Sequence, residues 1–275
     1  MKYSVLMSVY EKENPIWFQE SMESMLNQTI KTDDFVLVED GPLTKELEEI
    51  VVKYEQTYSD IFHVIRLKEN KGLGNALRIG IETCKNSWIA RMDSDDYSVP
   101  NRIEKEFAIV KENPEISLIG SSIAEFTDNI SNVISYRMLP TSHEGIVKYS
   151  KTRNPFGHPS VLLKKEMVLK AGNYRDYHLV EDYDLWIRMI ENGAVCYNLS
   201  EILVYMRIDE KFYQRRGGLS YLKSILKFKK EQYQKGYYSL SNYIVSAGSH
   251  IVSCLLPNFL RKFIYQKMLR RRRIS

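Results

Sequence analysis

The chain has 275 residues, of which 44% are hydrophobic and 27% charged, and its formal net charge is +4. This composition excludes a disordered chain, and three widely spaced cysteines, Cys84, Cys196 and Cys254, exclude a disulfide framework and a CxxC zinc site. The charge is unevenly divided: residues 1–204 carry 23 Lys and Arg against 32 Asp and Glu, a net charge of −9, whereas residues 205–275 carry 16 against 3, a net charge of +13. Such asymmetry suggests an anionic partner for the basic end.

The first 120 residues alternate between short apolar runs and longer stretches with helical spacing. The initial apolar run ends in charges by Glu11, which is too short for a signal peptide, and we find no run of 18 apolar residues. We therefore expect neither secretion nor a clear membrane-spanning helix. The patterns predict strands over 3–9, 35–38, 62–67, 88–92 and 117–120, and helices over 15–27, 45–58, 73–84 and 102–111. This alternation predicts an α/β domain with a largely parallel sheet and helices on both faces.

The region from 121 to 204 is less regular. It predicts a strand over 158–163 that starts near His158, a helix over 181–191, and two short strands over 195–199 and 202–206. The side chain of His158 is either a partly buried strand residue or a metal ligand or acceptor contact.

Acidic residues follow two of the predicted strands. Asp93, Asp95 and Asp96 lie within four residues after strand 88–92. Ligands of open α/β sheets bind outside the carboxyl ends of the strands. Closely spaced carboxylates repel one another unless a cation offsets them, and Mg²⁺ or Mn²⁺ takes such oxygen ligands and bridges phosphates. The alternative is a solvated acidic turn that caps the helix beginning near Pro100.

Asp40 ends the second strand, in the sequence Val38-Glu39-Asp40-Gly41. Its carboxylate suits hydrogen bonds from a base or a ribose hydroxyl, although an Asp-Gly turn explains the same residues. The segment 70–75 places Gly72 and Gly74 at a strand-to-helix junction, where a backbone can approach a ligand closely. Position 77 is Leu and no Gly-Lys-Ser/Thr follows, which disfavours a nicotinamide enzyme and a P-loop ATPase.

The helix predicted over 181–191 starts with Glu181, Asp182 and Asp184. Acids at a helix N-terminus favour the macrodipole, which is a sufficient structural explanation. A functional explanation is a general base that faces a cleft, with Arg188 one turn later to orient a carboxylate.

Together these segments resemble the family 2 glycosyltransferases with the GT-A fold, over about residues 3–210. The sequence is most similar to bacterial enzymes that build capsular, exopolysaccharide or O-antigen repeat units, and Arg215-Arg216-Gly217-Gly218 also resembles that subgroup. The motifs that carry the resemblance, in order, are Ser4-Val5-Leu6-Met7-Ser8-Val9-Tyr10, Val38-Glu39-Asp40-Gly41, Asn70-Lys71-Gly72-Leu73-Gly74, Ala90-Arg91-Met92-Asp93-Ser94-Asp95-Asp96 and Glu181-Asp182-Tyr183-Asp184-Leu185-Trp186.

The resemblance implies a nucleotide-sugar donor, usually UDP-linked, and a divalent metal, Mn²⁺ or Mg²⁺. Asp40 would bind the nucleotide base, and the backbone near Val9-Tyr10-Glu11 would line the same pocket. Asp93 would hold the ribose or the metal, Asp95 would ligate the metal, and Asp182 would be the catalytic base. Further candidate substrate contacts are Lys71, Gly72, Ser94, Glu181, Trp186, Arg207, Arg215 and Arg216.

One expected element is absent near the last strand. Family members often carry a His shortly after an Arg there, whereas this chain reads Arg207-Ile208-Asp209. Arg207, Arg215 or Arg216 would then neutralise the diphosphate. A carboxylate that takes the proton of an acceptor hydroxyl, with in-line attack, would invert the anomeric centre.

The basic end has a pattern of its own. Residues 236–260 contain no charged side chain, and apolar residues recur at three- to four-residue spacing over 244–264, followed by four arginines at 270–273. This favours an interfacial membrane helix, and the Ser and His content with Pro257 disfavours a spanning one. Two alternatives remain: the stripe packs on the catalytic domain, or the charge binds nucleic acid, for which no recognition fold is evident.

We therefore predict a GT-A catalytic domain over 1–210 and a helical, basic, membrane-associating segment over 211–275. The expected function is an inverting, metal-dependent glycosyltransferase that acts on a polyprenyl-diphosphate-linked saccharide at the inner face of the cell membrane, as a peripheral cytoplasmic protein that binds no nucleic acid. One rival is a sugar-1-phosphate nucleotidyltransferase, but the segment 10–13 lacks the expected glycine. The other is a non-catalytic polybasic binder, which would not need Asp182.

Overall fold

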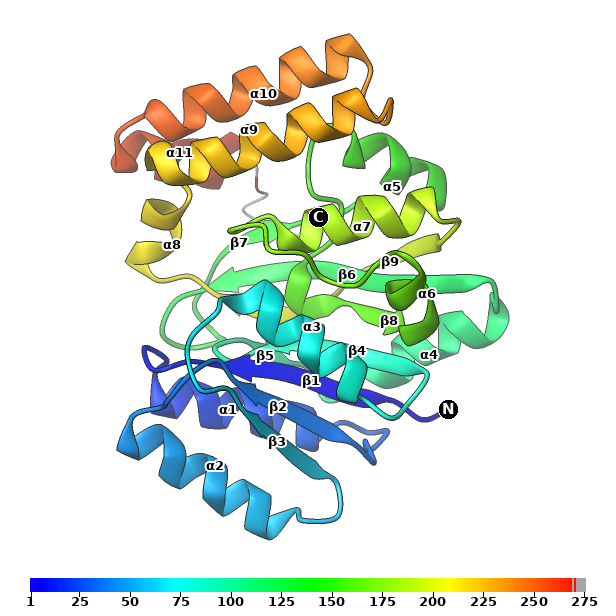
Figure 1. Ribbon diagram of the computed structural model, residues 1–275, viewed down its shortest axis with the longest axis vertical. Helices are drawn as coiled ribbons and strands as arrows, with labels where there is room; N and C mark the ends of the chain where they lie inside the picture. Colours follow the sequence, from blue (N-terminus) through cyan, green and yellow to red (C-terminus); the bar gives the residue numbers. More distant parts are fainter. Residues whose placement is uncertain (269, 271–275) are drawn as a thin grey trace.

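The computed structural model describes residues 1–268 and 270. It contains one curled sheet that is flanked by helices, and a group of C-terminal helices lies beyond them (Figure 1). The strands are β1 (Ser4–Val9), β2 (Phe35–Glu39), β3 (Phe62–Arg66), β4 (Trp88–Asp93), β5 (Tyr97–Ser98), β6 (Ile116–Phe126), β7 (Val133–Arg137), β8 (Leu162–Lys164) and β9 (Val195–Arg207). The helices are α1 (Pro15–Leu26), α2 (Lys45–Thr57), α3 (Leu73–Thr83), α4 (Arg102–Glu112), α5 (His143–Ser150), α6 (Lys165–Lys170), α7 (Glu181–Glu191), α8 (Glu210–Arg215), α9 (Gly218–Gln234), α10 (Leu240–Leu255) and α11 (Asn258–Met268).

The sheet is parallel in its first half and mixed in its second. Its strand order is β3-β2-β1-β4-β8-β6-β9-β5, and β7 pairs with β6. The strands β1 to β4 are parallel, as the alternating pattern predicts, and β8 runs antiparallel to both β4 and β6. The pairing register aligns Ser8 of β1 with Val38 of β2 and Asp93 of β4. The carboxyl ends of these three strands therefore share one edge.

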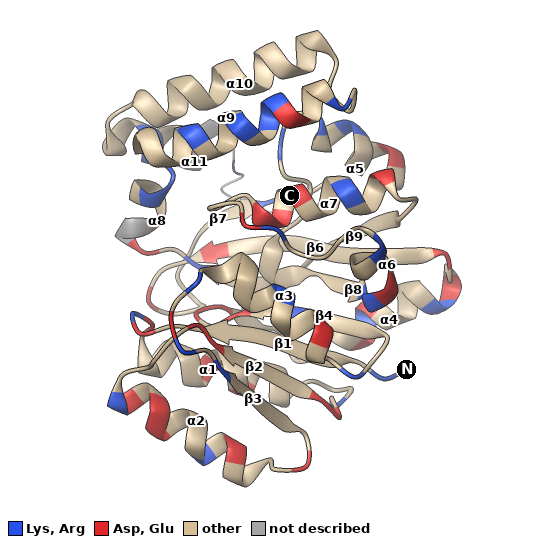
Figure 2. Ribbon diagram, in the orientation of Figure 1, with Lys and Arg blue, Asp and Glu red and all other residues tan. Residues whose placement is uncertain are grey.

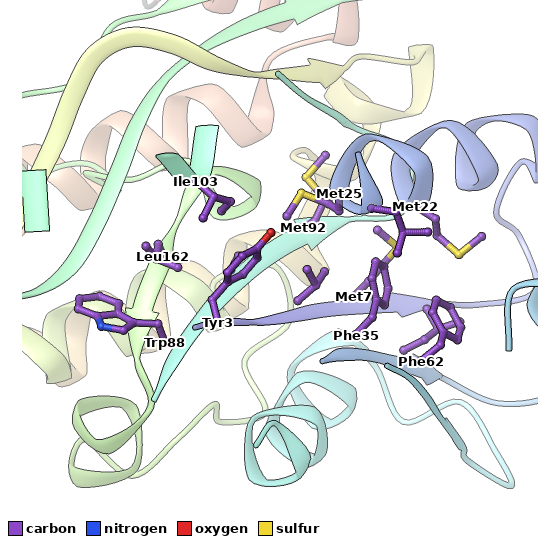
Figure 3. Packing of buried hydrophobic residues seen from close by; sticks show 14 of the residues in the cluster. Tyr3, Met7, Met22, Met25, Phe35, Phe62, Trp88, Met92, Ile103 and Leu162 are labelled. Carbon is purple, nitrogen blue, oxygen red and sulfur yellow. The ribbon is translucent and has the colours of Figure 1, made fainter. Parts of the chain in front are cut away.

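Side chains that alternate along the strands build a core on each face of the sheet. Tyr3, Val5, Met7 and Val9 are buried on one face, whereas Leu6 is buried on the other. Figure 3 shows the first of these clusters, in which the ring of Phe35 stacks on the ring of Phe62 in β3 with 4.8 Å between the two centroids. Because both faces are covered, the central strands read as continuous apolar runs.

Local sequence signals set the first two helix starts. The Asn14 side chain accepts hydrogen bonds from the backbone N–H groups of Ile16 and Trp17, and Pro15 occupies the first turn of α1. Thr44 caps α2 in the same way. Asn and Thr side chains satisfy the unpaired donors of a helix N-terminus, which is why these boundaries are readable from sequence.

The second half differs from the prediction. The strand expected over 117–120 extends over Ile116–Phe126, and the two strands expected over 195–199 and 202–206 are one strand, β9. These two strands pair in parallel along their length, and register shifts in the ladder absorb the interruption between Leu199 and Ile202. The strand predicted to begin at His158 is wrong at its start, because His158–Ser160 forms a 3₁₀ turn before β8. The pattern also missed β7, α5 and α6.

The C-terminal helices α9 and α10 lie side by side and pack on α7 (Figure 1). Tyr183 and Ile187 of α7 share a buried cluster with Ile225 and Phe228 of α9 and with Cys254 of α10. One side of the apolar stripe thus packs on the protein body. No helix within residues 1–268 is long and apolar enough to span a bilayer. The predicted boundary near residue 210 stays a prediction, and Arg271–273 of the arginine run lie outside the described residues.

Candidate active site

Asp40 joins two of the predicted binding segments. Its carboxylate accepts hydrogen bonds from the backbone N–H groups of Lys71, at 2.8 Å, and Gly72, at 3.0 Å. Its own N–H donates to the carbonyl of Val9. Gly41 has φ +90°, and a Cβ there would lie 2.7 Å from the nitrogen of Asn70, so only glycine permits this approach. The structure therefore brings together the residues predicted for the nucleotide base.

The acidic turn after β4 is partly buried: Ser94 and Asp96 are buried, whereas Asp93 and Asp95 keep part of their surface exposed. Burial first, and then the charges of Asp93 and Glu13, raise the pKa of Asp95 to about 8. Ser94 donates a 2.5 Å hydrogen bond to Glu13, whose pKa burial also raises. Asp96 is fully buried and accepts from the backbone N–H of the residue that ends β9, and its Oδ2 has no partner among the described residues. A cation would relieve this like-charge crowding.

The donor set fits a hard divalent cation in part. In the portion of the chain that the structure describes, no three His, Cys, Asp or Glu side chains converge as a ready metal site. Mg²⁺, however, is usually held by one or two carboxylates together with substrate phosphates. Asp93 and Asp95 supply two such carboxylates, and the nucleotide would supply the rest.

Arg207 supports the acidic turn. Its Nε donates to the carbonyl of Asp95 at 3.0 Å, its Nη1 donates to two backbone carbonyls, and its Nη2 donates to Glu20 at 2.8 Å. The guanidinium lies between the rings of Trp17 and Phe126, at 4.7 and 4.5 Å from their centroids. All three nitrogens are therefore engaged with protein acceptors, which argues against the prediction that Arg207 neutralises a diphosphate.

Arg215 is the better placed arginine for that role. Its side chain is half exposed, and its charge opposes the rise in the pKa values of Glu13 and Asp95. Its positive field also reaches Tyr10. Arg216, in contrast, lies over the ring of Phe212 and donates to the carbonyl of the same residue.

Asp182 lies in the first turn of α7 and is held by a loop residue. Asn154 Nδ2 donates to its Oδ2 at 2.6 Å, and the backbone N–H of Tyr183 donates to its Oδ1 at 2.7 Å. Burial raises the pKa of Asp182, while these two hydrogen bonds and nearby arginines oppose the rise. Burial and the Asp182 charge raise the pKa of Glu181 to about 8. Burial thus raises the pKa values of both adjacent carboxyl groups, and the hydrogen bonds from Asn154 and from the Tyr183 N–H oppose the rise at Asp182.

The family follows from comparison with known proteins. Residues 4–168 match the family model of Glycosyl transferase family 2. The chain belongs to this family. The enzyme class that the motifs implied is confirmed, and the nucleotidyltransferase and the non-catalytic binder are set aside.

Relatives and solved structures extend the match over nearly the whole glycosyltransferase. It is 40% identical over 271 residues to an uncharacterized glycosyltransferase of Haemophilus influenzae, which covers 98% of this chain and 100% of the relative. It is 34% identical over 270 residues to the UDP-Gal:alpha-D-GlcNAc-diphosphoundecaprenol beta-1,3-galactosyltransferase of Escherichia coli, with 98% and 97% covered. A mannosyltransferase from Pyrobaculum calidifontis, solved with GDP-Man and Mn²⁺, superposes with a TM-score of 0.65 at 12% identity, over 94% of this chain and 71% of that one. The predicted GT-A fold is confirmed.

Two residues of this glycosyltransferase site escaped the sequence analysis as individual contributors. Arg91 is fully buried on β4 and forms an ion pair with Asp93, while its Nε and Nη1 have no hydrogen-bond partner in the described part of the chain. Its charge also favours the ionised forms of Glu181 and Asp182. An arginine inside an apolar strand, two residues before an aspartate, was an available signal. No pattern in the sequence pointed to Asn154, because it lies in an irregular loop.

One predicted contact of the glycosyltransferase, Trp186, lies in its core instead. Trp186 is fully buried among Phe156, His158 and Tyr174, which argues against direct contact with substrate. His158 Nε2 lies 3.0 Å from the Tyr174 hydroxyl, and burial holds the pKa of His158 well below its usual range. His158 is partly buried in the 3₁₀ turn before β8 and packs edge-on against Trp186, which favours a packing role over contact with metal or acceptor. Tyr10 is half-buried and Glu11 exposed beside the acidic turn.

The glycosyltransferase also has a concave region of about 380 Å³ near α3. Its lining residues are Asn75, Arg78, Gly172, Tyr174, Arg175 and Asp176. A second, of about 400 Å³, lies near the start of β4 and is lined by residues that include Trp88 and Lys164. Since Trp88 begins β4 and Asp93 ends it, this second region lies away from the acidic turn.

Proposed function

We propose that this glycosyltransferase transfers a sugar, with inversion, from a UDP-sugar to a polyprenyl-diphosphate-linked saccharide in the synthesis of a bacterial surface polysaccharide. The observation that carries the proposal is that Arg91, which forms an ion pair with Asp93 of the acidic turn, also favours the ionised form of Asp182, which Asn154 holds in place. The Escherichia coli relative, at 34% identity, bears a name of this class.

The donor would bind along the shared edge of β1, β2 and β4. Asp40, the 70–72 loop and the backbone at 9–11 would receive the base, because they form one hydrogen-bonded wall. Asp93 and Asp95 would hold Mn²⁺ or Mg²⁺, and the bound ion would offset the charge of the diphosphate. Arg215 would approach the same phosphates, since its field already reaches Asp95.

The transfer itself needs one base. The acceptor hydroxyl oxygen attacks the anomeric carbon as the bond from that carbon to the phosphate oxygen breaks. Asp182 takes the hydroxyl proton, and the nucleoside diphosphate leaves with the bonding electrons. The hydrogen bonds from Asn154 and from the Tyr183 N–H favour the ionised form of Asp182 and orient its carboxylate. A single in-line displacement inverts the anomeric configuration.

The acceptor determines where the enzyme works. A polyprenyl-diphosphate saccharide resides in a membrane, so we place the glycosyltransferase at the inner face of the cell membrane as a peripheral protein. The +13 charge of residues 205–275 supports such a location, because clustered Lys and Arg are drawn to anionic lipid.

A donor screen tests the proposal. UDP-linked and GDP-linked sugars would be offered with a lipid-diphosphate GlcNAc acceptor, in Mn²⁺ and in EDTA, and the product linkage would be assigned by NMR. We expect transfer from one UDP-sugar, lost in EDTA, with inverted anomeric configuration. Retained anomeric configuration would contradict the inverting mechanism, and full activity in EDTA would contradict the need for a metal. Exclusive use of a GDP-sugar would contradict the UDP-linked donor.

A further inference from the structure

Helices α10 and α11 expose several large apolar side chains. We define the C-terminal apolar face by its six most exposed members at sequence positions beyond 240, which are Ile244, Val245, Val252, Leu255, Phe259 and Phe263. Their exposed fractions run from 56% to 70%. Large contiguous apolar surfaces on soluble domains usually mark an interaction site.

This face is opposite the side of α10 that packs on the body. Ser246, Ala247 and Cys254 are buried, and Ser246 receives the amine of Lys229 from α9. The face residues have no covering element among the described residues. An ordinary surface helix presents charged or polar side chains to water, whereas α10 has no Asp, Glu, Lys or Arg in its 16 residues.

Exposed lysines lie on α9, which packs beside α10, and on α11. Figure 2 shows α10 without a charged residue beside α9, which carries several lysines. Lys223, Lys227 and Lys230 of α9 are exposed, and so is Lys262, next to Phe263 on α11. An apolar surface with exposed lysines on the same and the neighbouring helix complements an anionic phospholipid bilayer. A second copy of the chain fits less well, because a symmetric contact would bring these lysines together.

We propose that the C-terminal apolar face inserts into the surface of an anionic phospholipid bilayer. The inference rests on the proposed function in one respect: docking would give the enzyme access to a lipid-linked acceptor.

Arg261 links the C-terminal apolar face to α8, the helix that precedes α9. This residue, which the sequence grouped with the basic tail, is buried and donates to the carbonyls of Ser253 and Leu256 at the α10–α11 turn. It also donates at 2.8 Å to the carbonyl of Tyr213 in α8, the helix that carries Arg215. Arg261 is therefore unavailable as a lipid-facing charge and instead connects the face to the arginine near the acidic turn.

Vesicle flotation tests the docking. The full chain would be mixed with neutral phosphatidylcholine vesicles and with vesicles containing about one-third phosphatidylglycerol. We expect the wild type to float with the anionic vesicles, more weakly in high salt. The double variant Val245→Glu/Val252→Glu should lose at least about tenfold in vesicle partitioning. The Val245→Leu/Val252→Leu variant keeps the apolar character and should float as the wild type does.

Matched controls separate docking from folding and from self-association. Leu169→Glu places a charge at an exposed apolar position of α6 and should leave flotation unchanged. Thermal melting and donor hydrolysis of the double variant should match those of the wild type. Equal flotation of the wild type and the double Glu variant would overturn the inference. The inference would also be overturned if the wild type formed a dimer and bound no vesicles, while the double Glu variant was a monomer.

Vesicle binding and sugar transfer fail independently. Flotation requires neither donor nor acceptor, so a protein that floats but transfers no sugar would refute the proposed function and leave the docking face standing. A protein that transfers sugar to a short-chain acceptor but does not float would refute the docking face and leave the proposed function standing.

Discussion

Asn154 Nδ2 donates a 2.6 Å hydrogen bond to Oδ2 of Asp182, across 28 residues of chain. This contact opposes the rise in pKa that burial imposes on the carboxylate. A base that must be ionised at neutral pH depends on such a donor, because burial alone would favour its protonated form.

Replacing Asn154 should move the pH profile. In Asn154→Ala the ionised form of Asp182 loses a hydrogen bond, so its pKa rises and the acidic limb of kcat moves to higher pH. A hydrogen bond to a charged group corresponds to a shift of about one pH unit. The profile of kcat against pH checks this, with Asn132→Ala in an exposed loop as the control. An unshifted limb would refute the assignment of Asn154 as the residue that positions the base.

Arg91 should be needed for activity. Its removal in Arg91→Met leaves Asp93 without its ion-pair partner and takes positive charge away from Glu181 and Asp182. We expect kcat/KM to fall about 100-fold or more. Arg91→Lys, which keeps the charge without the planar fork, should recover only part of the loss. A melting curve distinguishes this from misfolding, and a folded Arg91→Met variant with wild-type kcat/KM would contradict the prediction.

Lys229 should destabilise the fold near neutral pH. The side chain is fully buried on α9, and burial lowers the pKa of its amine to about 7. Between this value and its ordinary pKa of 10.5 the unfolded chain binds more protons than the folded one, so this residue's contribution to stability rises with pH there. Lys229→Met should be more stable than the wild type by about 1–4 kcal/mol at pH 7.

Urea unfolding at several pH values measures this difference. The advantage of Lys229→Met should shrink as the pH is raised toward about 9. Lys230→Met, at the exposed neighbouring position, should show little effect at any pH. A Lys229→Met variant that is less stable at pH 7, or a difference that ignores pH, would count against the account.

Gly217 should be irreplaceable beside Arg261. A Cβ at Gly217 would collide with the guanidinium of Arg261, which holds α11 to α8. Gly217→Ala should cost about 1–3 kcal/mol in unfolding free energy. It should also weaken UDP binding more than UMP binding, because α8 carries Arg215. Calorimetric titration with both nucleotides checks this, and equal losses for UDP and UMP would show that α8 does not serve the second phosphate.

The sequence predicted the first half of the fold because each strand there is a short apolar run bounded by clear turn or cap residues. The positions of Asp40 and Asp93 at the ends of strands were predictable for the same reason. The full lengths of β6 and β9 were not predictable, because the two strands pair along their whole length and carry buried polar residues such as Ser121 and Ser122, which interrupt the apolar pattern.

Roles that depend on distant partners were also beyond the sequence. Arg207 and Arg261 read as free positive charges, yet the fold surrounds each with carbonyl acceptors from other segments. Asn154 gains its role only because its loop meets the start of α7. A charge count cannot distinguish a solvated arginine from one that joins two helices.

The central claim is that Asp182 is the base that accepts the acceptor proton. The most direct measurement is kcat of Asp182→Asn in the metal-loaded enzyme, beside UDP affinity and the kcat of Glu181→Gln. The account predicts a loss in kcat of about 10²–10⁴ for Asp182→Asn, with UDP affinity nearly unchanged. Because the Glu181 carboxyl is largely protonated near neutral pH, its amide variant should lose far less. Retention of kcat within about threefold in Asp182→Asn, with UDP still bound, would contradict the account.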